Sequence, residues 1–122
     1  MPETKRSVFI SYALSDRNWA QELARSLKDL GQDAWIDGDE ESLEKGLRES
    51  NLIVLLATPE NVNRPNFFFD IGAAVGLGKP LVFVRSADLD LGAVPAALRH
   101  YKFLVKGSPE ATAEQLVQEI AA

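Results

Sequence analysis

The stretch Leu52-Ile-Val-Leu-Leu-Ala57 decides the fold. Six consecutive apolar residues, without alternation of polar and apolar side chains, are typical of a strand that helices cover on both faces. Two short runs of the same character lie at residues 7–12 and 81–85. We therefore expect residues 52–57 to form the central strand of a parallel sheet.

Helical patterns alternate with these strands. Trp19, Leu23 and Leu27 recur at helical spacing and predict a helix that ends at Gly31, where a C-terminal glycine cap belongs. Asp16 is expected to cap the start of this helix. The other expected elements are strands at 33–37 and 101–105, a short helix at 42–50, a polar loop at 58–66, a short helix after Pro95 and a last helix from Pro109 with Leu116, Val117 and Ile120 as its core contacts.

Residues 66–77 predict an unusual helix. They are apolar almost all round, which predicts a helix buried on most sides, and Asp70 is their only charged residue. A carboxylate costs several kcal/mol to bury unless it is hydrogen-bonded, paired or facing a water-filled cleft. The positive end of the helix stabilises an anion there. Asp70 is therefore either a functional group or an acid that faces solvent or an arginine such as Arg64 or Arg85.

This order of elements predicts one α/β domain over residues 1–122. Strands that alternate with helices imply right-handed crossovers and a doubly wound sheet. We expect the flavodoxin-like five-stranded parallel order 2-1-3-4-5, whose ligands bind between the carboxyl ends of the first and third strands. Those ends are residues 11–13 and 57–59, and the helix after the third strand brings Asp70 close to them.

Composition excludes several classes of function. The net charge of −5 and the acidic stretch between residues 33 and 44 disfavour nucleic-acid binding. The absence of cysteine and the single histidine, His100, argue against a metal site and a cysteine nucleophile. No apolar run reaches the roughly 18 residues of a membrane span, so we expect no membrane partner and a cytoplasmic location.

Residues near the expected site have two interpretations each. Ser11 and Tyr12 either contact a ligand or pack and cap the strand end. Trp35 is either an aromatic residue at the rim of the core or a stacking platform. Phe67 to Phe69 are expected in the core, although one of these rings could flank a planar ligand ring.

Three segments resemble Toll/interleukin-1 receptor (TIR) domains, and bacterial ones in particular. The first is Val8-Phe-Ile-Ser-Tyr12, followed by Asp16. The second is residues 50–58, SNLIVLLAT, and the third is residues 66–84, NFFFDIGAAVGLGKPLVFV, which is the most specific. The resemblance spans nearly the whole chain and implies a TIR-like fold.

The resemblance also implies an activity and a site. Many TIR domains hydrolyse the bond between nicotinamide and ribose in NAD with a glutamate on this helix, and Asp70 matches that position. It implies that Asp70 is catalytic, that Ser11, Tyr12, Ala13, Trp35 and Phe67 line the nucleotide pocket, and that NAD is a substrate rather than a cofactor. Partners would be the nucleotide and other TIR domains, including copies of the same chain. The lead-in at residues 64–66 is similar to a nucleotide-sensing branch that acts in signalling and antiphage defence.

Two alternatives stay open. Asp70 is one methylene shorter than glutamate, and displacements of about 1 Å can cost on the order of a hundredfold in rate. The segment between Asp37 and Ser50 is also shorter than the usual family loop. A non-catalytic interaction or nucleotide-sensing module is therefore one alternative. The other is a nucleoside deoxyribosyltransferase-like enzyme, a family whose helix ends in a similar Gly78-Lys-Pro80 turn but which pairs a nucleophilic glutamate with an upstream acid.

Overall fold

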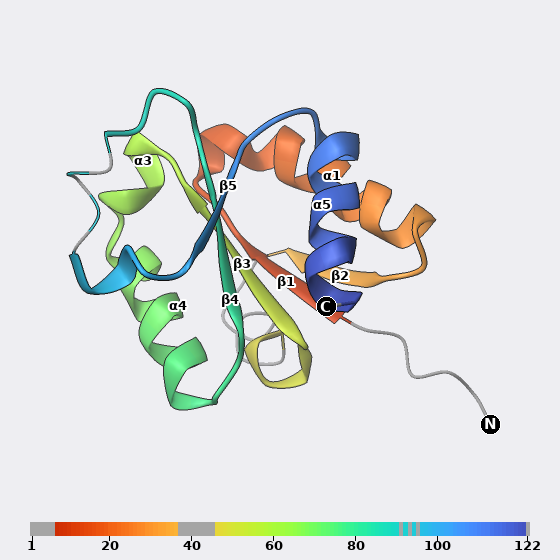
Figure 1. Ribbon diagram of the computed structural model, residues 1–122, viewed down its shortest axis with the longest axis horizontal. Helices are drawn as coiled ribbons and strands as arrows, with labels where there is room; N and C mark the ends of the chain where they lie inside the picture. Colours follow the sequence, from red (N-terminus) through yellow and green to blue (C-terminus); the bar gives the residue numbers. More distant parts are fainter. Residues whose placement is uncertain (1–6, 37–45, 91, 93, 95, 122) are drawn as a thin grey trace.

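Five parallel strands form one sheet in the order β2-β1-β3-β4-β5, as the sequence predicts (Figure 1). Residues 7–36, 46–90, 92, 94 and 96–121 of the chain are described by this computed structural model. All four strand pairs are parallel. The strands are β1 (Ser7–Ser11), β2 (Asp33–Ile36), β3 (Leu52–Ala57), β4 (Leu81–Arg85) and β5 (Lys102–Val105).

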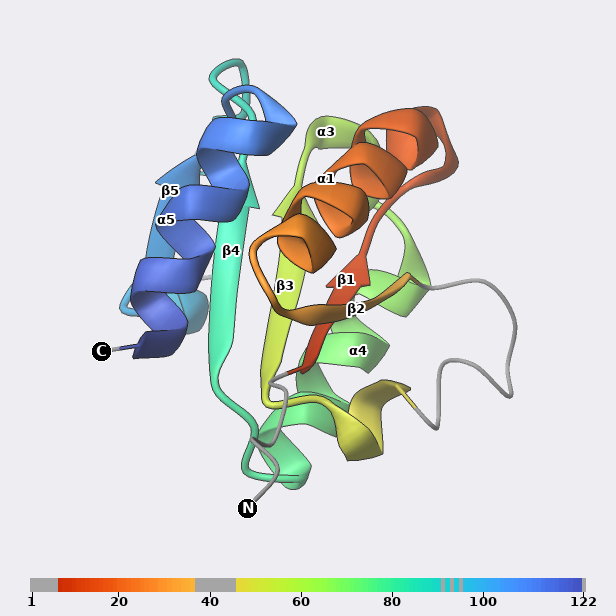
Figure 2. The ribbon, with the colours of Figure 1, turned by 90° about the vertical axis from the view of Figure 1, so that its right-hand side faces the viewer.

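Helices cover both faces of this sheet. Figures 1 and 2 show α1 and α5 side by side on one face and α4 on the other. Gly31, with a φ of 87°, follows Leu30, the C-cap residue of α1, and confirms the predicted glycine at the end of this helix. The helices are α1 (Arg17–Asp29), α3 (Pro59–Val62), α4 (Pro65–Gly76) and α5 (Pro109–Ala121), with short 3-10 helices η1 (Leu14–Asp16) and η3 (Ala96–Leu98).

The strands divide their side chains between two cores. On β1, Val8 and Ile10 pack with α1 and α5, whereas Phe9 packs on the side of α4. Every residue of β3 is buried, because alternate side chains enter opposite cores. The unbroken apolar run of β3 is therefore explained, as predicted, by the helices that cover this strand on both faces.

A glycine closes the α4-side core next to β1. Gly46 begins a short helical stretch over residues 46–49, the described part of the helix expected at 42–50. A Cβ atom added to Gly46 would lie 2.5 Å from Cδ1 and 2.8 Å from Cε1 of Phe9. Phe9 has no exposed surface, so the backbone at Gly46 approaches this ring more closely than any side chain would permit.

The polar loop expected at 58–66 contains a helix instead. Thr58 precedes α3, and its Oγ1 accepts a hydrogen bond from the backbone N–H of Asn61 at 3.3 Å. Pro59 occupies the first helical position, where a missing N–H costs nothing. A threonine cap and a proline suffice for one helical turn that has no apolar periodicity.

The prediction that α4 is buried on most sides is wrong. Phe68, Phe69 and Val75 expose 46%, 60% and 52% of their surface, and Gly72 and Gly76 are exposed beside them. Only one side of this helix packs against the sheet, where Phe67, Ile71 and Ala74 are buried. We call Phe68, Phe69, Gly72, Val75 and Gly76 the apolar α4 face.

Candidate functional site

The buried side of α4 carries Asp70 to the carboxyl end of β1. Asp70 has no exposed surface, and its Oδ2 accepts a hydrogen bond from Ser11 Oγ at 2.7 Å. Ser11 is the last residue of β1 and is itself fully buried. Phe67, Asp70 and Ala74 face the sheet together because they follow each other at intervals of three and four residues. The carboxylate thus lies at the switch point that the fold predicts.

Two expectations for Asp70 need correction. The carboxylate does not face solvent. It is also the sixth residue of a helix that begins at Pro65, so it lies in the second turn, beyond the strongest influence of the helix end. The helix dipole therefore stabilises this carboxylate less than it would in the first turn, and the hydroxyl of Ser11 stabilises it directly.

Arg64, one of the two arginines predicted as alternative partners of Asp70, binds elsewhere. It holds the N-cap position of α4, and its Nη1 donates to the carbonyl oxygen of Tyr12 and to Oδ1 of Asn61. Asn61 in turn donates from Nδ2 to the carbonyl oxygen of Leu56 at 2.6 Å. The start of α4 is therefore tied to the carboxyl ends of both β1 and β3.

The other predicted pocket residues separate between the two faces. Phe67 is buried on the α4 side, and Trp35, which pairs with Phe9 in the sheet, packs half-buried against the same core. Tyr12 belongs to the opposite core with α1 and α5, and only its carbonyl oxygen meets Arg64. Ala13 is buried just before η1. Ser11, Phe67 and Asp70 thus share one side of the sheet, and the Tyr12 side chain does not join them.

The Phe67 ring lies beside two other aromatic rings, Phe83 in the core and Phe68 on the exposed side of α4. It stands 6.2 Å from Phe83 and 5.2 Å from Phe68, measured between ring centroids. The interpretation of Phe67 as a core residue is thereby supported. Its role in flanking a ligand ring stays a prediction.

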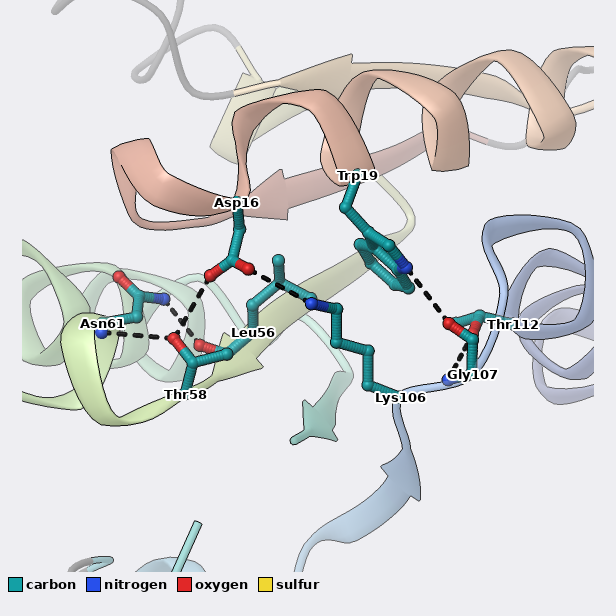
Figure 3. A network of polar contacts seen from close by, with 8 residues as sticks. All are labelled: Asp16, Trp19, Leu56, Thr58, Asn61, Lys106, Gly107 and Thr112. Atoms are coloured by element: carbon teal, nitrogen blue, oxygen red, sulfur yellow. Dashed lines mark hydrogen bonds and ion pairs between the residues drawn. The ribbon is translucent and has the colours of Figure 1, made fainter. Parts of the chain in front are cut away.

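The sequence does not predict a polar cluster that lies at the carboxyl edge of the sheet (Figure 3). Asp16 stands at the N-cap position of α1 but makes no capping bond with its side chain. Its Oδ2 accepts from Thr58 Oγ1 at 3.3 Å, and its Oδ1 pairs with Lys106 Nζ at 3.2 Å. The expectation of a helix cap is therefore wrong, because the Asp16 carboxylate bonds instead to two residues that follow other strands, Thr58 after β3 and Lys106 after β5.

Trp19 links the same cluster to α5. The Lys106 ammonium lies 5.1 Å from the centroid of the Trp19 ring, and Trp19 Nε1 donates to the carbonyl oxygen of Gly107 at 3.1 Å. Lys106 directly follows β5, so the strand order alone would place it at the edge where Asp16 lies. The charges of this cluster compensate each other, and we assign it a structural role in joining α1 to the end of β5.

The Asp16–Lys106 pair is expected to contribute measurably to stability. Its side chains expose only 13% and 24% of their surface, so a double-mutant cycle with Asp16→Asn and Lys106→Met should give a coupling of about 1 kcal/mol in urea unfolding. The exposed pair Lys102–Glu119, at 3.5 Å, is the matched control and should couple more weakly. Equal coupling in the two pairs would contradict the structural role.

Two structural features are absent from the described part of the chain. Within it, no three histidine, cysteine, aspartate or glutamate residues gather closely enough to hold a metal ion. Within it, too, no helix is long and apolar enough to cross a membrane.

Comparisons with known proteins agree with this geometry. A family model described as a TIR domain matches residues 8–117. The TIR domain of the Toll-related receptor TRR-2 from Hydra magnipapillata is similar in structure, with a TM-score of 0.71, 19% identity, and coverage of 94% of this chain and 98% of that one. No curated protein matches the chain.

Two further solved structures share the fold. The CMP N-glycosidase BcmB from Clostridium botulinum has a TM-score of 0.63 and 13% identity, and the match covers 93% of this chain and 99% of that one. A flavodoxin from Streptococcus pneumoniae has a TM-score of 0.54 and 18% identity, with coverage of 97% and 98%. At these identities the likeness concerns the fold alone, and it agrees with the flavodoxin-like strand order.

Proposed function

Because the chain belongs to the TIR domain family, we propose that it is an N-glycosidase that hydrolyses the nicotinamide–ribose bond of NAD or the corresponding bond of a related nucleotide. Asp70 is the catalytic carboxylate in this proposal. The observation that carries it is the fully buried carboxylate of Asp70, held by Ser11 Oγ at 2.7 Å at the switch point of the sheet. The proposal includes a role in bacterial signalling or antiphage defence.

With a nicotinamide nucleotide the chemistry needs only one carboxylate, whereas cytosine leaving CMP would also have to take up the proton that the attacking water releases. When the bond from C1′ of ribose to the pyridinium nitrogen breaks, its electron pair leaves with nicotinamide, which departs as a neutral molecule without a proton. Positive charge develops on the ribose, and an anion beside it stabilises this oxocarbenium-like state. Water then adds to C1′ and releases a proton. Ser11 would hold the Asp70 carboxylate in one orientation for this role.

The similarity to a CMP N-glycosidase supports the choice of reaction class. The name of that protein describes cleavage of an N-glycosidic bond in a nucleotide, on the same fold as this chain. NAD and simpler nucleotides such as CMP are both candidate substrates. Because Asp70 has no exposed surface, substrate binding must displace the groups that cover it.

The direct test follows release of the base. The concentrated protein, with a crowding agent, is incubated with NAD and separately with CMP, and nicotinamide or cytosine is measured by chromatography. Release that an Asp70→Ala variant lacks would support the proposal. The absence of release from both substrates, or release that Asp70→Ala retains, would overturn it.

A second candidate function, non-catalytic self-association, rests on the apolar α4 face. Gly72 and Gly76 leave open space where side chains would stand, and Phe68, Phe69 and Val75 project around it. Two copies related by a twofold axis would place the aromatic rings of one copy over the glycines of the other. The occupant of the face in this proposal is therefore a second copy of the chain, held by a small and weak interface.

Substituting Phe69 with serine is expected to abolish this association. Light scattering and sedimentation over a range of concentrations should show dimers of the parent protein and monomers of Phe69→Ser, because the substitution removes the most exposed aromatic ring of the face. Leu14, which is 77% exposed on η1, offers a matched control as Leu14→Ser. A parent protein that is monomeric at every concentration would overturn this candidate.

A further inference from the structure

Arg64 is a half-buried cation that has no anionic partner in the described part of the chain. Its Nη1 donates to two neutral oxygens, the Tyr12 carbonyl and Asn61 Oδ1. No described carboxylate pairs with it, and no described group accepts a hydrogen bond from its Nε or Nη2. Lys106, by contrast, lies at the same edge of the sheet and is neutralised by Asp16.

The two bonds of Nη1 fix the guanidinium in place. Tyr12 follows the end of β1, and Asn61 is itself fully buried and bonded to the Leu56 carbonyl oxygen. A guanidinium is planar, so fixing one nitrogen restricts the directions in which the other N–H groups point. These remaining donors are therefore prearranged for an acceptor, and the residue keeps exposed surface through which one could approach.

Two elements, the end of β1 and helix α4, bring Arg64 and Asp70 close to each other. Asp70 is bonded to Ser11 and Arg64 to Tyr12, which are consecutive residues of the chain. On α4 the two residues are six positions apart, or about 9 Å along the helix axis. The Asp70 carboxylate and the Arg64 guanidinium are thus held by neighbouring residues at the carboxyl end of β1.

From this juxtaposition we infer that Arg64 binds the 5′-phosphate of a nucleotide whose glycosidic carbon lies at Asp70. The inference rests on the proposed N-glycosidase function and adds a specificity to it. The charges are complementary, since the carboxylate faces the ribose that becomes positive and the guanidinium faces the phosphate. The site therefore selects 5′-phosphorylated N-ribosides over the free nucleosides.

Binding measurements test this selectivity without turnover. In an Asp70→Asn background, calorimetry compares nicotinamide mononucleotide with nicotinamide riboside, which lacks only the phosphate. We expect the mononucleotide to bind at least tenfold more tightly, and Arg64→Met to remove this preference while the affinity for the riboside stays the same. Arg64→Lys, which keeps the charge but loses the fork, should retain part of the preference.

A matched control separates this effect from a general loss of positive charge. Arg99 also donates to a backbone carbonyl, that of Val94, but lies before β5 at the other edge of the sheet, so Arg99→Met should leave the preference unchanged. If Arg64→Met unfolds, a full preference in Arg64→Lys overturns the assignment and a reduced one supports it.

The result is independent of the cleavage assay. Equal binding of the two ligands, binding of neither, or a preference that Arg64→Met retains would overturn the inference, even in an active enzyme. A phosphate preference in a protein that releases no base would support Arg64 as an anion site while the glycosidase proposal fails.

Discussion

Replacing Asp70 with asparagine is expected to lower the rate of base release about a thousandfold. Asparagine has nearly the size and shape of aspartate, so the side chain stays at the end of β1 and its amide oxygen still accepts from Ser11 Oγ. The negative charge that would stabilise the developing oxocarbenium ion is lost. Removal of one such electrostatic or acid–base group typically costs two to four powers of ten in rate, by order of magnitude.

The stability of the same variant separates a catalytic from a structural carboxylate. Asp70 is fully buried, and asparagine keeps its size, leaves no cavity and can still accept from Ser11 Oγ, so the free energy of unfolding should change by only about 1 kcal/mol. Asp29→Asn, at the end of α1, is the control for a change of net charge. A loss of several kcal/mol in Asp70→Asn, with activity falling only as the folded fraction falls, would contradict the catalytic role.

Replacing Phe83 with alanine is expected to destabilise the domain by about 3–5 kcal/mol, a large part of the roughly 5–15 kcal/mol that such a domain possesses. Phe83 has no exposed surface at the centre of the α4-side core. Its ring stacks on Phe103 at 4.8 Å and contacts Tyr101 edge-on at 6.0 Å, between centroids. The cavity would open under α4, the helix that carries Asp70.

Guanidinium chloride unfolding measures this effect. Phe69→Ala is the matched control, because it deletes the same ring from a site that is 60% exposed and should cost far less. A similar loss in the two variants would mean that the aromatic cluster around Phe83 does not hold the sheet to α4.

Much of the fold could be predicted because its central strands carry a strong and simple signal. The runs at residues 52–57 and 81–85 are apolar without interruption, and both strands have these bounds in the structure. Right-handed crossovers then leave few ways to arrange five strands. The same rule brought Ser11 and Asp70 to one place, and the hydrogen bond between them confirms that geometry.

The wrong predictions for α4 and Asp16 have a common cause. The local sequence does not show which way a side chain points or which distant residue it contacts. A helix that is apolar on every side does not indicate which side faces the core, so the sequence of α4 could not reveal that Phe68 and Phe69 point outward. The pattern at Asp16 is that of a helix cap, but the choice of partner depended on Thr58 and Lys106, which are distant in sequence. Tertiary contacts decided both cases, and local propensity did not.

The close approach of Gly46 to Phe9 has an evolutionary consequence. With a Cβ atom at position 46 only 2.5 Å from the ring, any larger residue there demands a smaller one at position 9. Among natural sequences with this fold, the two positions should therefore vary together, with an aromatic ring on the strand wherever the short helix carries glycine. Compensating exchange, with alanine or a larger side chain at position 46 and an aliphatic one at position 9, would preserve the total volume of the core.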